Sequence, residues 1–206
     1  PRKMNVTITG CVDNCTHPES QDIGLVPASK NISGTEVKGF NLFVGGKMGS
    51  GGFCSAKDLD VFVQPEQTPA LCSEIALIFR DHGARAERTK CRLSFLLEAW
   101  GVPKFRAELD SRWSNRIGQK LSAAGTDLRS DTETEHLGVT AQKQPGLVAV
   151  GLSIPVGRVS AKQLREIARL SEVYGSGDVR ITPQQNMIIV NVPQSKLAAL
   201  QEEPLL

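Results

Sequence analysis

Residues 147–170 read LVAVGLSIPVGRVSAKQLREIARL, and the spacing of the apolar residues changes partway along this stretch. The run from Leu147 to Ile154 is short and mostly apolar, as in a buried strand. Ser160 and Gln163 have the spacing of a capping box, which closes the first turn of a helix. We therefore expect a strand followed by a helix that ends at Gly175. The helix is expected to pack through four apolar residues, Leu164, Ile167, Ala168 and Leu170.

The residues after this helix continue the same alternation of element types. Val179–Thr182 and Met187–Val192 are strand-like and flank the insert Pro183-Gln184-Gln185-Asn186. A further helix is expected from Lys196. The order strand, helix, strand, helix predicts an α+β sandwich such as the ferredoxin-like arrangement.

The first part of the chain also mixes strands and helices. Short strands are predicted at Met4–Thr9, Gly24–Ala28 and Phe40–Val44. Three helices follow, with starts at Thr68, at about Thr89 and at Pro103. Gly83 is expected to end the first and Gly101 the second. Their expected buried residues are Leu71, Ile75, Ile78 and Phe79, then Phe95, Leu96 and Trp100, then Phe105, Leu109, Trp113, Ile117 and Leu121.

A polar, Thr- and Asp-rich stretch from Ala124 to Pro145 breaks the apolar periodicity. We place a domain boundary in it and divide the chain into residues 1–136 and 137–206. The first Met is residue 4 and the chain stops at Leu206 without a closing feature, so we expect a piece of a longer protein.

The composition excludes several classes of protein. The 206 residues carry 24 Lys and Arg against 22 Asp and Glu, a net charge of +2, which argues against a strongly basic nucleic-acid binder. With 40% hydrophobic and 22% charged residues, the chain is an ordinary globular one. No apolar run approaches the length of a membrane span. The five cysteines form no disulfide framework, so reduced thiols inside a cell are expected.

Three groups of residues could carry chemistry. The spacing Cys11-x3-Cys15, with His17 nearby, is typical of half of a metal or iron–sulfur cluster site. A complete site needs four ligands. Lys3 and Asn5 would project side by side from the polar face of the first strand and could bind a small oxyanion. The glycine loop around Lys47 is either a mobile turn or a backbone cradle for an anion. A basic cluster is either a solvated helix face or an anion-binding wall: Arg80, Arg85, Arg88, Lys90 and Arg92.

Several motifs together resemble the siroheme-dependent nitrite and sulfite reductases. Pro1-Arg2-Lys3-Met4-Asn5-Val6 is similar to a Pro-Arg-Lys-aromatic segment of that family, although Met4 replaces the aromatic residue. Gly39-Phe40-Asn41-Leu42-Phe43-Val44-Gly45-Gly46 is similar to its glycine loop. The ferredoxin-dependent nitrite reductases are matched most closely, by Phe79–Gly83, Arg88–Leu93, Tyr174–Gly177, Arg180–Asn186 and Glu203–Leu206.

The resemblance implies a fold and an activity. The family has two repeats, each a ferredoxin-like half followed by a larger α/β half. The chain would then join the mixed α/β half of the first repeat to the ferredoxin-like half of the second. The implied enzyme is a ferredoxin-nitrite reductase of nitrate assimilation, which reduces nitrite to ammonia with six electrons. Siroheme coupled to a 4Fe-4S cluster is the implied cofactor.

The resemblance also assigns site residues, position by position. Lys3 matches the substrate-binding lysine. Asn5 matches a position that is Asn in nitrite reductases and Lys in sulfite reductases, and a neutral amide suits monoanionic nitrite. Four residues match a basic run near the siroheme carboxylates: Arg85, Arg88, Lys90 and Arg92. A siroheme-facing segment of the second repeat is matched by Thr182, Gln185 and Asn186.

The family's cluster cysteines lie beyond Leu206, so Cys11 and Cys15 are expected to bind no metal and the piece to be inactive alone. The implied partners are reduced ferredoxin and nitrite, with no nucleic acid and no membrane. The intact enzyme is expected to be a monomer in a bacterial cytoplasm or a plastid stroma. Two alternatives stay open: an assimilatory sulfite reductase, and a non-catalytic metal or redox module that uses Cys11, Cys15 and His17.

Overall fold

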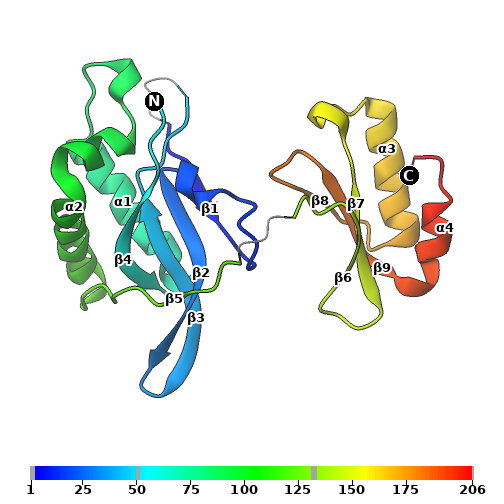
Figure 1. Cartoon of the computed structure of the whole chain (residues 1–206), viewed down its shortest axis with the longest axis horizontal. Coiled ribbons are helices and arrows are strands. Elements are labelled where there is room, and N and C mark those ends of the chain that lie inside the picture. The colour runs from blue at the N-terminus through cyan, green and yellow to red at the C-terminus, as the bar shows by residue number, and fades with distance from the viewer. Residues whose placement is uncertain (1–2, 50–51, 131–133, 206) are drawn as a thin grey trace. The chain divides into compact units, whose positions relative to one another are not determined.

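The computed structural model describes residues 3–49, 52–130 and 134–205. Pro1, Arg2 and Leu206, which belong to motifs noted above, and Gly51 of the loop around Lys47 lie outside the described residues. The chain divides into two compact units, Pro1–Thr132 and Glu133–Leu206, and each is described here by itself (Figure 1). The division lies within the polar stretch Ala124–Pro145. The assignment of the two units to successive repeats stays a prediction.

The first unit is built on a sheet with the order β1-β2-β3-β4, and a short strand, β5, pairs with β2 at Ala28 and Ser29, beyond β1 on the edge of β2 that β3 leaves open. β1 (Val6–Ile8) runs parallel to β2 (Ile23–Ile32), because an irregular loop brings the chain back to the same end of the sheet. β2, β3 (Thr35–Val44) and β4 (Lys57–Val63) are antiparallel neighbours. β5 is Thr126–Asp127. No strand was predicted from the sequence at the position of β4.

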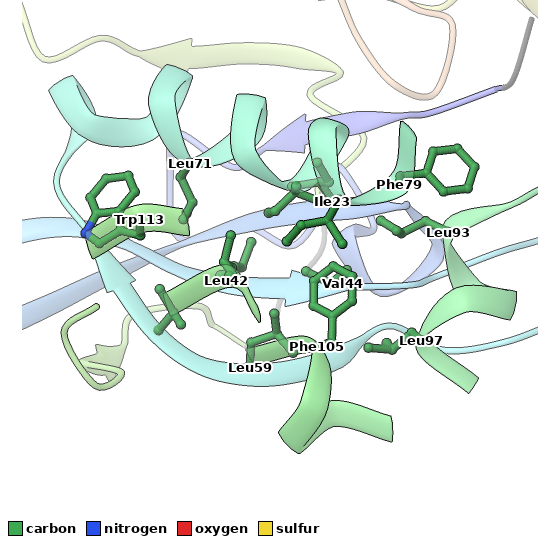
Figure 2. Close-up of a cluster of buried hydrophobic side chains, with 14 of the residues drawn as sticks. Ile23, Leu42, Val44, Leu59, Leu71, Phe79, Leu93, Leu97, Phe105 and Trp113 are labelled. Carbon is green, nitrogen blue, oxygen red and sulfur yellow. The ribbon is translucent and has the colours of Figure 1, made fainter. Parts of the chain in front are cut away.

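One face of this sheet is covered by the two long helices, α1 (Thr68–His82) and α2 (Leu93–Ile117). Alternate strand residues point to that face, and Figure 2 shows them meeting helix side chains in one cluster. The cluster includes Ile23, Leu25, Leu42, Val44, Leu59, Leu71, Ile75, Ile78, Phe79, Leu93, Leu97, Phe105, Leu109 and Trp113. The predicted burial of the first helix is therefore confirmed.

The second predicted helix begins later than expected. Arg88–Lys90 form a 3-10 turn, and α2 starts at Leu93. The predicted end at Gly101 corresponds to a break inside α2, where φ is 76° and ψ is 157°. The predicted burial of Ile117 is wrong, since it is 38% exposed at the last turn of α2. Helical spacing indicates which face an apolar residue lies on, but not whether the core extends that far along the helix.

The second unit has a four-stranded sheet in the order β6-β7-β9-β8. Its strands are β6 (Gly138–Ala141), β7 (Leu147–Leu152), β8 (Val179–Ile181) and β9 (Met187–Pro193). The helices α3 (Ala161–Tyr174) and α4 (Leu197–Gln201) pack on the sheet (Figure 1). Their shared core is Val148, Val150, Leu152, Ile167, Leu170, Ile189, Val192 and Leu200.

The predictions made from local sequence in this unit are confirmed in part. The predicted capping box is present: Gln163 N donates to Ser160 Oγ, and the Gln163 side chain accepts from Ser160 N. Ile167 and Leu170 are buried as expected, whereas Leu164 is 48% exposed and Ala168 is also exposed. Each unit thus combines a sheet with helices, and the α+β fold class is confirmed. No helix in the described ranges is long and apolar enough to cross a membrane.

Candidate functional site

The segment that leads into β1 carries Lys3 and Asn5. Lys3 is exposed, and Asn5 is half-buried. The backbone of Asn5 is held on both sides: its N–H donates to Asp22 Oδ2 at 2.8 Å, and its carbonyl accepts from Ile23 N at 3.0 Å. Its side-chain Nδ2 donates to Gln21 Oε1 at 3.2 Å. Asn5 is therefore fixed, and the Lys3 side chain extends from a fixed base.

The glycine loop around Lys47 is hydrogen-bonded, through Gly45 and Gly46, to Gln21 and Asp22. Gly45 N donates to the carbonyl of Asp22 at 2.9 Å, and Gly46 N donates to the carbonyl of Gln21 at 2.8 Å. A side chain at Gly46 would collide with the backbone carbonyls of Glu19 and Gln21, so this approach requires glycine. These amides and that of Lys47 bond to carbonyls, so they are not a cradle for an anion.

Lys47 is buried, at 3% exposure, although it carries a charge. Its backbone pairs in both directions with Cys54, at 2.8 and 2.9 Å, which closes the glycine loop. Its Nζ lies 4.0 Å from the centre of the Phe95 ring, in the first turn of α2. This cation–π contact brings a buried positive charge to the start of α2.

The basic cluster separates into three kinds of environment. Arg92 points inward and donates two hydrogen bonds to the Asp22 carboxylate, from Nε to Oδ1 at 3.0 Å and from Nη2 to Oδ2 at 2.7 Å. Arg85 donates to carbonyls at the end of α1, including those of Phe79 and Gly83, and stacks on the Phe79 ring. Arg88 is exposed, and Lys90 pairs with Glu87 at 2.9 Å on the surface.

Arg80, the fifth residue of the cluster, belongs to a surface network. Its Nε lies 2.7 Å from Asp81 Oδ1, and Arg112 Nη1 lies 2.9 Å from Asp81 Oδ2. The hydrogen bonds from Arg80 and then from Arg112 lower the pKa of Asp81 to about 2. The five basic residues therefore do not form one wall, and only Arg92 is joined to Asn5 by a shared partner.

In the second unit, the predicted residues lie together in the turn between β8 and β9. Thr182 and Asn186 are buried and bond to each other, Thr182 N to the Asn186 carbonyl at 2.9 Å and Asn186 N to Thr182 Oγ1 at 3.0 Å. Asn186 Oδ1 also accepts from Ile154 N at 2.9 Å. Gln185 is exposed and has a φ of 67°. Gln184 Oε1 is buried and receives no hydrogen bond from a described residue.

The cysteines do not assemble into a metal site in the part of the chain that the structure describes, where no group of three or more His, Cys, Asp or Glu could hold an ion. Cys11 is exposed and Cys15 is buried. Burial, followed by the neighbouring Cys11, raises the pKa of the Cys15 thiol. Cys91 is buried and its thiol donates to the Glu87 carbonyl, whereas Cys72 is half-buried.

Sequence reasoning missed Asp22 and Gln21, which bind three of the noted segments. Asp22 is completely buried, and so the charge of its carboxylate must be balanced inside the fold. The available signal was an aspartate directly before the apolar run that starts at Ile23. That signal indicates an unusual carboxylate, but it does not name a partner seventy residues away in the chain.

Comparison with known proteins agrees with the motifs. The family model described as nitrite and sulphite reductase 4Fe-4S domain matches residues 1–117, and the nitrite/sulfite reductase ferredoxin-like half domain matches residues 140–206. The chain is 40% identical over 206 residues to the chloroplastic ferredoxin–nitrite reductase of Spinacia oleracea, covering all of this chain and 34% of that protein. It is 38% identical over 218 residues to the assimilatory ferredoxin-dependent nitrite reductase of Haloferax mediterranei, covering all of this chain and 36% of that protein.

A solved structure gives the same result. The Mycobacterium tuberculosis NirA protein superposes with a TM-score of 0.83 at 30% sequence identity, over 94% of this chain and 34% of that one. The chain thus spans about a third of the length of the relatives it matches. On the match to residues 1–117, more than half of its length, the chain belongs to the nitrite and sulphite reductase family.

Proposed function

We propose that the chain is part of a ferredoxin-dependent nitrite reductase, which reduces nitrite to ammonia with six electrons. The relatives from Spinacia oleracea and Haloferax mediterranei carry that activity in their names. Asn5 supports nitrite over sulfite, because a neutral amide adds no charge beside the lysine, and nitrite carries one negative charge where sulfite carries two.

The observation that carries the proposal is the convergence of three segments on Gln21 and Asp22. The segment with Lys3 and Asn5, the glycine loop and Arg92 are far apart in the sequence, yet all bond to these two residues. They are also the segments that resemble the family. Their meeting is expected of a preorganised site and is not required by the core alone.

The residues present suit a polycarboxylate such as siroheme. Ser94, in the first turn of α2, is 4% exposed, and its Oγ has no hydrogen-bond partner among the described residues. A carboxylate oxygen would accept from this hydroxyl. Arg92, two residues earlier, uses Nε and Nη2 for Asp22, which leaves Nη1 for a ligand. The proposed cofactor-binding set remains Arg85, Arg88, Lys90, Arg92, Thr182, Gln185 and Asn186.

When bound, siroheme coupled to a 4Fe-4S cluster supplies the electron transfer that the reduction needs. The residues of this chain bind and protonate the substrate. The Lys3 ammonium attracts the nitrite anion and can donate a proton to one of its oxygens. Asn5 has given one amide N–H to Gln21, so its second N–H and its Oδ1 remain to orient the substrate.

The wider setting is also proposed. Residues 1–136 would be the last part of a first repeat and residues 137–206 the ferredoxin-like start of a second. The cluster cysteines would lie outside this chain, and the donor would be reduced ferredoxin. We place the intact protein, as a monomer, in a bacterial cytoplasm or a plastid stroma.

The experiment is to purify the intact parent protein and supply it with reduced ferredoxin and nitrite. We expect one ammonium formed and six reduced ferredoxins oxidised for each nitrite consumed, with siroheme in the absorption spectrum. A parent without siroheme that makes no ammonium would refute the proposal. Metal analysis of the chain alone tests the rival: stoichiometric zinc or iron that is lost in Cys15→Ala would favour a metal module.

A further inference from the structure

Asp22 has the contacts of a residue that orients the substrate site without touching the substrate. It is completely buried, and its carboxylate accepts three hydrogen bonds. They come from Asn5 N at 2.8 Å, Arg92 Nη2 at 2.7 Å and Arg92 Nε at 3.0 Å. A buried carboxylate is tolerated only when it is paired and hydrogen-bonded in this way.

We propose that Asp22 is the positioning residue of the nitrite site, an inference that rests on the proposed function. One carboxylate fixes two groups at once. Through Asn5 N it fixes the segment that leads into β1 and carries Lys3 and Asn5. Through its two bonds to Arg92 it sets which edge of the guanidinium faces inward, and so which nitrogen is left for a ligand.

Asp22 also sets the charge of the site. The Arg92 side chain is 15% exposed and its charge is balanced by Asp22. Lys3 is exposed, and no carboxylate in the described ranges pairs with it. Lys3 therefore offers the substrate a positive charge that no described carboxylate balances, whereas the charge of Arg92 is balanced by Asp22, and this arrangement suits a monoanion. Without the Asp22 charge, Arg92 would add a second positive charge and favour a dianion such as sulfite.

The test is the variant Asp22→Asn in the intact holoenzyme, which keeps the shape and removes the charge. We expect kcat/KM for nitrite to fall by about 10- to 100-fold, as for other residues that do not touch a ligand but hydrogen-bond the residues that bind it. We also expect the ratio of sulfite to nitrite kcat/KM to rise. A loss of folding alone would lower kcat/KM for nitrite and for sulfite by the same factor and would leave this ratio unchanged.

The matched control is Asp60→Asn. Asp60 is another carboxylate of the first unit that pairs with an arginine, Arg106, at 3.6 Å, and its hydrogen bonds among the described residues involve Asp58, Arg106 and Ala124, none of them a proposed site residue. We expect this control to keep the wild-type ratio. If Asp22→Asn matches Asp60→Asn in both kcat/KM and the ratio, the positioning role is refuted while the reductase function stands. A wild-type parent without nitrite reduction refutes the function itself.

A second variant keeps the test decisive if Asp22→Asn does not fold. In Asp22→Asn with Arg92→Gln, both buried charges are removed together, so neither is left unpaired. Because Arg92 is also a proposed siroheme ligand, this variant is assayed at full siroheme occupancy, fixed by its absorption spectrum, and we expect it to lose about 10-fold or more in nitrite kcat/KM. Its ratio of sulfite to nitrite kcat/KM should stay near that of wild type, because neither residue leaves an unbalanced charge. Wild-type kcat/KM in the double variant would overturn the proposal.

Discussion

The proposed residues of the two units are held in different ways. In the first unit, Asn5, Gly45 and Arg92 come from separate elements and meet at Gln21 and Asp22. In the second unit, Thr182 and Asn186 bond to each other within a single turn. The first arrangement depends on buried charge and on contacts between distant segments, and the second on uncharged hydrogen bonds within one turn and from Ile154. Substitutions of Asn5 or Arg92 should therefore affect chemistry most, whereas substitutions of Thr182 or Asn186 should also lower the stability of the second unit.

The largest effect is expected at Lys3. In the intact parent, Lys3→Ala removes the ammonium that we propose binds and protonates nitrite, and turnover should fall about 100- to 1000-fold. The siroheme absorption spectrum should not change. Lys38→Ala, at an exposed lysine of β3, is the control and should leave turnover as it is. Loss of siroheme from Lys3→Ala would show that Lys3 binds the cofactor instead.

The next effect tests the second unit. Asn186→Ala removes the acceptor for Ile154 N and should lower the free energy of unfolding of that unit by about 1–3 kcal/mol. The single Tyr, Tyr174, lies in this unit, and both Trp residues, Trp100 and Trp113, lie in the first. Urea unfolding of the chain should therefore shift the tyrosine signal and not the tryptophan signal. Equal shifts in both would contradict a local role.

Asn5→Lys should change selectivity by a smaller factor. The added positive charge is expected to raise the sulfite-to-nitrite ratio of kcat/KM in the parent by about tenfold, because sulfite carries twice the charge. Asn5→Gln keeps a neutral amide and serves as the control. An unchanged ratio in Asn5→Lys would remove Asn5 as a determinant of substrate choice.

The smallest effect is expected at Lys90. Its side chain is 61% exposed, and that of its partner Glu87 is 60% exposed. Lys90→Ala should change the unfolding free energy of the first unit by no more than about 0.5 kcal/mol, as for other exposed pairs. Tryptophan fluorescence during urea unfolding measures it. A loss above about 2 kcal/mol would indicate a structural role that the surface pair does not explain.

The sequence predicted best what is decided within a few residues. The capping box at Ser160 and Gln163 and the break at Gly101 both depend on local backbone geometry, and both are present. The burial of Ile117 and Leu164 could not be predicted, since it depends on what the rest of the fold places over them. For the same reason the basic cluster looked uniform, although only Arg92 turns inward, toward a carboxylate seventy residues away.

We propose that the first unit carries the substrate site of a nitrite reductase. The most direct test is kcat/KM of the intact parent for nitrite and for sulfite, measured with reduced ferredoxin under the same conditions. We expect a clear preference for nitrite, because the Lys3 ammonium beside the neutral amide of Asn5 suits a monoanion. A clear preference for sulfite would contradict it.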